Sequence, residues 1–411
     1  MVAIAVGLAP AAGGQAEAST VEVSSTTLLA VRPDVRLGEV RSAVPIVELV
    51  GLSAQGFEVP AVDDLKLRVS GWGRVDAVEG RDLAGDLEFA FLQGRLFDRR
   101  LSLTMGRHLV SGGAARLTQL DGASADVRIG RGLGVSAFGG VPVVPRFAVA
   151  KGDLAYGGRV YYRALIDTEV GVSYAHTLDH GLTARQDAGL DARVRLMRGL
   201  VVSGYGLWSL AEQRLAEIDI GPTWMATPDV QARVEYRRTA PDLFLPRRSI
   251  FSVFAEMQRD EVGGDVSWQL NRWANLFADY FSLWTGDGRG DDASARATFR
   301  SDPAARAQFG VQARVFRVPV NGYVQGRVFG SYRAMNKVTV SLDLDGYQFT
   351  QAINGARSTF TGALTGSYNF LPGWLAVVSA SGGTTVLLQT RYELFAKLVF
   401  NYPTTTSGLT P

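Results

Sequence analysis

The stretch Tyr392-Glu-Leu-Phe-Ala-Lys-Leu-Val-Phe-Asn-Tyr402 alternates between two kinds of side chain. Apolar residues occupy every even position, whereas Glu393, Lys397 and Asn401 stand on odd positions, together with two further apolar residues. Side chains of a β-strand point alternately to its two faces. The spacing therefore predicts a strand with one apolar face and one mainly polar face.

Similar short segments of alternating apolar and polar residues, which we call bursts, recur from about residue 65 to residue 402. In one of them Leu65, Leu67 and Val69 alternate with Lys66 and Arg68. Turn signals such as Asp121-Gly122 separate them, and no helical pattern of comparable strength lies between them. We therefore predict an all-β fold, an antiparallel up-and-down barrel that crosses a membrane with its apolar face outward. The bursts number roughly twenty, and because single-chain bacterial barrels have even strand numbers we predict about 18 strands, with 16 to 20 as the range.

Composition excludes several classes of protein. The 411 residues are 46% hydrophobic and 20% charged, which is too polar for a bundle of membrane helices. The longest apolar run, Met1 to Ala12, is shorter than the roughly 20 residues that a membrane-spanning helix needs. The chain has no cysteine, which excludes thiol catalysis, cysteine–zinc sites and disulfides. A net charge of +2 does not indicate a nucleic-acid partner.

Four segments are expected along the chain. Residues 1–18 are predicted to be a signal peptide, because the apolar start is followed by Ala16-Glu17-Ala18, a typical cleavage site. Residues 19–61 lack the strand rhythm and are interpreted as a periplasmic lead-in, a small plug or a strand of their own. Residues 62–402 form the predicted barrel, and residues 403–411 form a C-terminal tail.

Aromatic residues fall near the predicted strand ends, where the rings of a transmembrane barrel form girdles at the two membrane surfaces. A soluble β-domain with aromatic residues in its core is the alternative interpretation. The girdle candidates are Trp72, Trp208, Trp224, Trp268, Trp284, Trp374 and Tyr402.

The polar face of each strand would line the lumen, and its charged residues are candidates for a constriction that filters solutes. The alternative is that these charges pair across strands and stabilise the wall. The candidates are Arg128, Arg159, Arg193, Arg195, Arg233, Glu235, Arg237, Arg296, Arg314, Arg327 and Asp343.

Other kinds of site receive little support. His176 and His180 have the spacing of a helical metal pair, but they lie in a predicted strand-to-loop connection, and we expect a polar loop without metal. The third histidine is His108, and the chain has no G-x-S-x-G motif. We therefore predict neither a catalytic site nor a cofactor, although a hydrolase built on the barrel wall remains the third hypothesis.

The alternating strands, the leader, the aromatic positions and a last strand that ends in aromatic residues resemble bacterial outer-membrane β-barrels of the porin type. The segment Gly94 to His108 is similar to an early hairpin of many porins, with His108 where a Gln is common. The chain continues past the last aromatic residue, unlike the usual pattern. This resemblance implies insertion by the barrel-assembly machinery into the outer membrane of a Gram-negative bacterium, among lipid and lipopolysaccharide.

The resemblance also implies a function. We expect a channel for passive diffusion of small hydrophilic solutes through a lumen lined by Arg, Asp and Glu, and the arginines among the lumen candidates favour anionic or sugar-like solutes. The alternative is the barrel component of an export or surface machine, for example for polysaccharide, that works with periplasmic partner proteins. A homo-oligomer is compatible with either function.

Overall fold

The computed structural model describes residues 19–406 except 37–38, 60–61, 79–82, 114, 144–152, 165–167, 241–257, 302–305 and 389. The regular structure in this part of the chain consists of β-strands, and none of its segments is a helix long and apolar enough to cross a membrane. In chain order the strands are β1 (Ser19–Arg36), β2 (Glu39–Ala43), β3 (Pro45–Val59), β4 (Val62–Asp76), β5 (Ala84–Leu96), β6 (Leu101–Gly112), β7 (Ala115–Gly130), β8 (Leu133–Pro142), β9 (Leu154–Ala164), β10 (Thr168–Asp179), β11 (Leu182–Met197), β12 (Leu200–Ser209), β13 (Arg214–Thr227), β14 (Val230–Thr239), β15 (Arg259–Asn271), β16 (Ala274–Thr285), β17 (Gly288–Arg300), β18 (Ala307–Arg317), β19 (Gly322–Met335), β20 (Val338–Ile353), β21 (Ala356–Leu371), β22 (Trp374–Thr384) and β23 (Arg391–Thr406).

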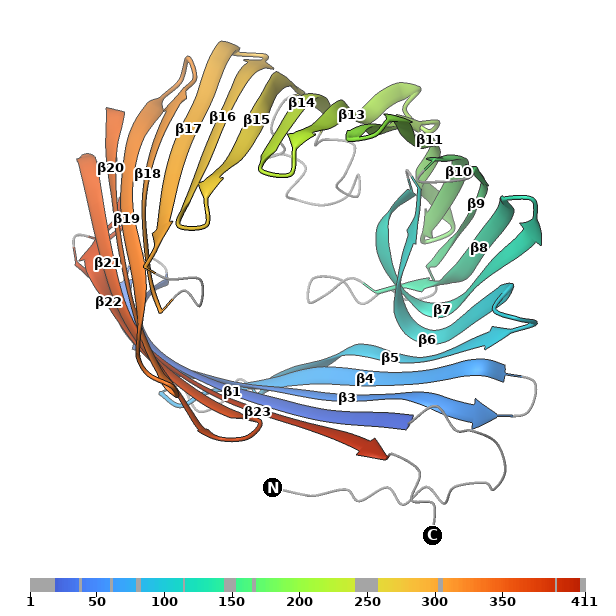
Figure 1. The fold of residues 1–411 in the computed structure, drawn as a ribbon, viewed down its shortest axis with the longest axis horizontal. Coiled ribbons are helices and arrows are strands. Elements are labelled where there is room, and N and C mark those ends of the chain that lie inside the picture. The colour runs from blue at the N-terminus through green and yellow to red at the C-terminus, as the bar shows by residue number, and fades with distance from the viewer. Residues whose placement is uncertain are drawn as a thin grey trace.

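The strands close into a barrel (Figure 1). Each wall strand pairs antiparallel with its neighbour, and the first strand pairs with the last from Ser19 opposite Thr406 to Val31 opposite Leu394. β1 also pairs with β3, whereas the short β2 forms a hairpin with the end of β1. The barrel wall therefore contains 22 strands, with β2 outside it. This confirms the predicted all-β class.

The predicted number of about 18 strands is wrong. The structure places a wall strand at nearly every burst between residues 65 and 402. The number of strands predicted from the bursts was therefore too low. The burst expected near residues 250–258 lies mostly outside the described residues. Two further wall strands, β1 and β3, come from residues 19–61.

Of the three interpretations of residues 19–61, the lead-in and the plug are wrong and the strand alternative agrees with the structure, because this segment supplies two strands, β1 and β3, that close the barrel. The weaker alternation there misled the prediction: Glu48 stands among outward-facing apolar residues, where it accepts hydrogen bonds from Ser25 and Thr27 at 2.5 and 2.6 Å. The predicted tail also begins too early, since β23 continues to Thr406. The predicted signal peptide and residues 407–411 lie outside the described residues.

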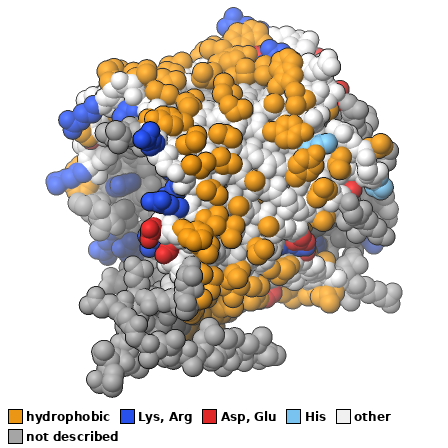
Figure 2. All heavy atoms as spheres, turned by 90° about the vertical axis from the view of Figure 1, so that its right-hand side faces the viewer, with side chains coloured by type: hydrophobic (Ala, Val, Ile, Leu, Met, Phe, Trp, Pro, Cys, Tyr) orange, Lys and Arg blue, Asp and Glu red, His pale blue; other side chains and the backbone are white. Residues whose placement is uncertain are grey.

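The outer face of the barrel is apolar. Large hydrophobic side chains are exposed at alternate positions, for example Val160 and Tyr162 on β9, Val172 on β10 and Leu190 on β11. Figure 2 shows this face, where hydrophobic side chains are spread over the surface and charged ones are few. Val172 lies directly opposite both Val160 and Leu190. The alternation along each strand thus becomes a continuous apolar surface around the barrel.

The two ends of the barrel differ. Ser19 and Thr406 lie at the same end, where strands are joined by short turns such as Arg131-Gly132 and Pro372-Gly373. At the opposite end, more residues separate the end of β8 from the start of β9, and the end of β14 from the start of β15. Short periplasmic turns and longer external loops are typical of outer-membrane barrels. We call these ends the short-turn end and the loop end.

Candidate functional site: a hairpin folded into the lumen

One hairpin leaves the wall near the loop end. β6 pairs with β5 only up to Arg107 opposite Ala90, and β7 pairs with β8 only from Leu120 opposite Pro142. β6 and β7 nevertheless continue to pair with each other as far as Gly112 opposite Ala115. Figure 1 shows the ends of β6 and β7 curving into the barrel interior. We call residues 108–120 the luminal hairpin.

A row of glycines lies where the hairpin bends away from the wall. Gly106, Gly122 and Gly140 are direct cross-strand partners on β6, β7 and β8. Gly106 has a φ of 108°, which L side chains rarely adopt. A Cβ atom at Gly122 would lie 2.6 Å from the Cα of Gly140. Glycine is therefore required at this row, because the three strands approach too closely for any side chain.

Arg107 fastens the outer side of the bend. Its Nε donates to Asp121 on β7 at 2.7 Å, and its Nη1 donates to the Leu87 carbonyl and to Asp86 on β5 at 2.7 and 3.1 Å. One guanidinium group thus joins three strands at the point where their backbone pairing stops. Because each bond is charge-assisted or directed at a backbone carbonyl, the bend is held in one geometry.

The tip of the luminal hairpin rests against the wall of β9–β11. A Cβ atom at Gly113 would lie 2.6 Å from Nε of Arg159 and would overlap the Asp191 carboxylate. Arg159 forms ion pairs with Asp191 and, at 2.8 Å, with Glu169. The tip therefore packs on a neutralised charge cluster, which fixes how far the hairpin reaches across the lumen.

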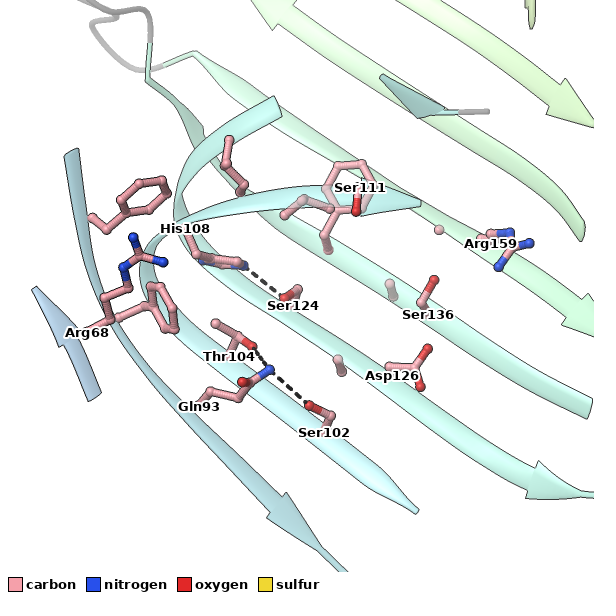
Figure 3. Close-up of a pocket in the computed structure, with 18 residues that line it drawn as sticks. Arg68, Gln93, Ser102, Thr104, His108, Ser111, Ser124, Asp126, Ser136 and Arg159 are labelled. Atoms are coloured by element: carbon pink, nitrogen blue, oxygen red, sulfur yellow. Dashed lines mark hydrogen bonds between the residues drawn. The ribbon is translucent and has the colours of Figure 1, made fainter. Parts of the chain in front are cut away.

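A pocket of about 430 Å³ lies between the luminal hairpin and the wall of β4–β9. Figure 3 shows Arg68 at one end, Arg159 and Asp126 at the other, and a row of polar side chains between them. Gln93 donates to Ser102 and Thr104, at 3.4 Å in each case. The residues that supply polar groups to the pocket are Arg68, Gln93, Ser102, Thr104, His108, Ser111, Ser124, Asp126, Ser136 and Arg159.

His108 joins the base of the hairpin to the wall. Its ring is buried, with 4% of the residue exposed. Nδ1 lies 2.9 Å from the Gly106 carbonyl, which can only accept, so in the neutral ring Nε2 accepts from the Ser124 hydroxyl, also at 2.9 Å. A Ser–His contact is thus present, but a carbonyl stands where a hydrolase triad has a carboxylate. The geometry is that of a structural hydrogen bond.

The predicted lumen residues all lie on the strand face opposite the exposed apolar residues, as Arg128 does between the exposed Val127 and Ile129. Most of them are ion-paired. Arg314 binds Asp292 at 2.5 Å, and Nε of Arg327 donates to Asp343 at 2.9 Å. These contacts support the wall-pairing alternative for such residues. The candidates with ion pairs are Arg159, Arg233, Glu235, Arg237, Arg314, Arg327 and Asp343.

Glu235 is the centre of the largest of these networks. It is 3% exposed and lies between Arg233 and Arg237, each of which donates to one of its oxygens. Both arginines also approach Asp219, at 3.6 Å in each case. Burial of a carboxylate requires such partners, because an unpaired buried charge is strongly destabilising. This network therefore belongs to the wall and leaves little charge available to a solute.

Three predicted lumen arginines, Arg128, Arg193 and Arg296, form no ion pair within the described residues; Arg195 lies on the same face of its strand. The guanidinium carbon of Arg296 lies 5.4 Å from the centroid of the Phe277 ring. This is within the limit of about 6 Å for a cation–π contact. Arg68 was not among the candidates, but its surroundings are similar to those of Arg296. It is exposed and lacks a carboxylate partner in the described part of the chain. Its guanidinium carbon lies 4.9 Å from the centroid of the Phe89 ring. The constriction role of these residues stays a prediction.

The girdle candidates lie at two levels. Trp224, Trp268, Trp374 and Tyr402 stand near the short-turn end, and Trp208 and Trp284 near the loop end. Trp374 packs on Phe400 with ring centroids 4.6 Å apart, and the other five are between 40% and 57% exposed. Trp72 differs, because it shares its strand face with Lys66 and Arg68 and therefore lies on the luminal side. Its position near a strand end did not reveal which face it occupies.

The two loop histidines lie apart. His176 is on the outer face of β10, where the Tyr156 hydroxyl lies 2.7 Å from its Nδ1. His180 occupies the β10–β11 turn beside Asp179, and its backbone N–H donates to Asp153 at 3.1 Å. The side chains of Asp153, Asp179 and His180 come within 4.8 Å of one another. His176, which has the spacing of a helical metal pair with His180, does not belong to this group.

The luminal hairpin itself was not predicted from sequence. The strand pattern continues smoothly through Leu101–Gly112 and Ala115–Gly130, so alternation marks these segments as ordinary wall strands. Glycines at Gly106, Gly122 and Gly140 were the available signal, but their alignment across three strands is visible only once the register is known. Arg107, beside the first of them, has no distinctive sequence pattern.

No protein-family model matches the chain. No curated protein matches it either. Among solved structures, the translocation pore of the P pilus usher PapC has a TM-score of 0.50 and 9% identity, with 92% of this chain and 99% of the pore covered. OccK8 (OprE) of Pseudomonas aeruginosa has a TM-score of 0.46 and 12% identity, and the match covers 95% of this chain and 100% of the OccK8 chain. At such identities the likeness concerns the fold.

A closed antiparallel barrel leaves no backbone edge unpaired towards lipid, and its apolar outer face suits the hydrocarbon layer. The predicted resemblance to porin-type outer-membrane barrels is confirmed at the level of the fold. The predicted localisation is confirmed as well: the protein is a transmembrane β-barrel of the bacterial outer membrane.

Proposed function

We propose that the protein is an outer-membrane channel through which small hydrophilic solutes diffuse passively. The observation that carries this proposal is the luminal hairpin, which narrows a lumen lined with charged and hydroxyl-bearing side chains. A polar lining favours water in the interior, and a fold-back segment reduces the passage to a size at which wall residues meet each solute. The hairpin thus supplies the constriction that an open wall would lack.

Charge distribution around the lumen supports a selective passage. On β13–β16 the acids Asp219, Glu235 and Glu261 are paired with arginines, whereas Asp265 lies directly opposite another acid, Asp279. The hairpin side instead offers Arg68 and Arg128 without ion pairs among the described residues. Opposed charges across a water-filled lumen create a transverse field that orients polar and charged solutes. The luminal acids of β13–β16 are Glu217, Asp219, Glu235, Glu261, Asp265 and Asp279.

Reconstitution of the full chain in planar bilayers tests the proposal. We expect steady current that is proportional to voltage, and a reversal potential in a salt gradient that reports the ion preference. Heat-unfolded protein from the same preparation is the control. Silent bilayers together with co-purification of periplasmic proteins would contradict the channel and favour the export machine.

Cysteine labelling tests the hairpin directly, because the chain contains no cysteine of its own. Ser111→Cys places a thiol on the luminal hairpin, and a charged water-soluble thiol reagent should then reduce the single-channel current. Val234→Cys is the matched control, because Val234 is 57% exposed on the outer face and should meet lipid instead of the reagent. Unchanged current after confirmed modification of Ser111→Cys would exclude the hairpin from the conducting path.

One observation also favours the second candidate, a barrel that passes a larger cargo in an export machine. The wall has 22 strands, whereas 16 to 18 strands already enclose an aqueous channel in porins. A wider wall accommodates a polymer if the hairpin can move aside. Stable unit conductance in the bilayer supports the passive channel, and large conductance that appears only with a periplasmic partner supports export.

A further inference from the structure

We propose that the pocket beneath the luminal hairpin binds a small organic anion that carries several hydroxyl groups, such as a sugar acid or a sugar phosphate. This inference rests on the proposed channel function and names the class of solute that the channel would retain longest. It follows from three properties of the pocket: an available cation, a row of hydroxyl and amide groups, and aromatic rings.

Arg68 supplies the available cation. Arg159, at the other end of the pocket, is neutralised by Asp191 and Glu169, whereas Arg68 has no carboxylate partner within the described residues. Its guanidinium carbon lies 4.9 Å from the centroid of the Phe89 ring, and a contact with a ring face leaves the N–H groups of the guanidinium able to donate. A planar fork of donors matches a carboxylate or phosphate group in a bidentate contact.

The polar row follows from strand register. Thr104 lies directly opposite Ser124, and Asp126 lies directly opposite both Ser102 and Ser136. Because neighbouring strands stand about 4.8 Å apart, these groups repeat at a spacing within reach of the hydroxyls on one sugar ring. Hydroxyl side chains both donate and accept, and the Asp126 carboxylate, at the end of the pocket away from Arg68, only accepts, so the row suits a ligand whose own hydroxyls do both.

Aromatic rings complete the pocket. Phe89, Phe91 and Phe138 line it from β5 and β8, and the first two lie edge to face with centroids 6.5 Å apart. Such rings can cover the C–H face of a sugar while its hydroxyls reach the polar row. A purely inorganic anion could bind Arg68 and accept from the hydroxyls, but it would leave the aromatic rings without a partner. The combination therefore selects an anion that is organic and hydroxylated.

Solute-induced current interruptions in planar bilayers test the inference, with D-gluconate, D-glucose 6-phosphate, D-glucose and butyrate as probes. We expect gluconate or glucose 6-phosphate to interrupt the current at lower concentration than glucose or butyrate. Arg68→Gln should weaken the effective probe about tenfold, which corresponds to loss of one charged hydrogen bond. The preferred probe tells whether the site takes a carboxylate or a phosphate.

Arg296→Gln is the matched control, because Arg296 is also exposed, unpaired among the described residues and stacked on a phenylalanine, but lies on β17 outside the pocket. It should leave probe affinity unchanged. An unaltered β-sheet circular dichroism spectrum shows that each variant is folded.

Equal loss of probe affinity in both variants would overturn the site, because it would show a general effect of luminal charge. Butyrate as effective as gluconate would overturn the role of the hydroxyl row.

If the bilayers are silent, titration calorimetry of the same probes with detergent-solubilised protein separates the two proposals. Arg68-dependent binding there would retain the site while the channel function fails, and absence of binding would overturn the site.

Discussion

Two stretches of the barrel wall face each other across the lumen and use charge differently. The pocket stretch, β4–β8, has hydroxyls, aromatic rings and Arg68 beneath the luminal hairpin, and Arg68 has no carboxylate partner among the described residues. The network stretch, β13–β20, carries many charges, most of them in ion pairs such as Arg314 with Asp292. The difference teaches that the number of luminal arginines does not measure how much positive charge a solute meets.

The physical reason lies in desolvation. A carboxylate that is nearly buried, such as Glu235 or Asp292, needs a cation to offset the lost hydration, so the arginines beside it serve the wall. Arg68 is exposed and has hydration of its own, so it can exchange water for a solute. The pocket stretch is thus the side of the lumen on which recognition is expected, and the network stretch is the rigid side.

The largest expected effect breaks the bend at which the luminal hairpin leaves the pocket stretch. Gly122→Val places a side chain where the Cα of Gly140 lies 2.6 Å from an added Cβ atom. We expect a loss of about 3 kcal/mol or more in the free energy of unfolding, because backbone atoms cannot move aside. Urea unfolding in lipid vesicles, followed by tryptophan fluorescence, measures it.

Gly326→Val is the matched control for that experiment. Gly326 is a wall glycine on β19, and a Cβ atom there would meet nothing within 4 Å. Its substitution should change the unfolding midpoint little. Similar losses in both variants would contradict a special role for the glycine row.

A smaller effect should follow from opening an ion pair of the network stretch. Arg314→Gln leaves Asp292, which is 8% exposed, without its cation. We expect a loss of about 1–3 kcal/mol in the free energy of unfolding, with ion selectivity largely retained. Asp292→Asn in the same background should restore part of the stability, because the uncompensated charge is then gone. Failure of this rescue would show that Arg314 acts by packing instead of charge.

A still smaller loss of stability is expected when the bend of the luminal hairpin is loosened. Arg107→Ala removes the donor that joins β5, β6 and β7, and we expect a loss of about 1–2 kcal/mol together with increased open-channel noise as the hairpin moves. The control is Arg391→Ala, which removes an exposed pair with Glu393 worth little. Current noise equal to that of the unaltered protein would show that the hairpin is held by other contacts.

The smallest effect on stability is expected for an arginine of the network stretch that has no ion pair among the described residues. Arg296→Gln removes an exposed, unpaired arginine from the network stretch, so the free energy of unfolding should change by about 0.5 kcal/mol or less. The reversal potential should nevertheless shift towards cation preference, because a charge that meets the solution is lost. A large stability loss without a selectivity change would place Arg296 among the wall residues.

Much of the fold could be predicted from local pattern. Alternation located nearly all the strands from β4 to β23 and assigned Arg128, Arg314 and Arg327 to the luminal face, because side-chain direction depends only on position along a strand. β1 and β3 were missed, since Glu48 interrupts the apolar face and its hydrogen bonds to β1 cannot be seen in sequence. Trp72 was misassigned for a related reason: its distance from a strand end says nothing of its face.

The site was less accessible to such reasoning. Whether an arginine is available depends on carboxylates of neighbouring strands, as for Arg159 with Glu169 on β10 and Asp191 on β11. The inward hairpin depends on three glycines meeting across β6, β7 and β8. Both are properties of register, which the spacing of residues along one strand leaves open.

The sequence by itself therefore determined the all-β class, the strand faces and the membrane-facing surface, because these follow from a two-residue period within single strands. Only the tertiary structure decided that β1 closes the barrel against β23, that β6 and β7 bend into the lumen, and that Arg68 has no carboxylate partner among the residues that the structure describes. Those outcomes depend on contacts between residues far apart in the chain, where steric fit and desolvation select one arrangement among many that the same alternation allows.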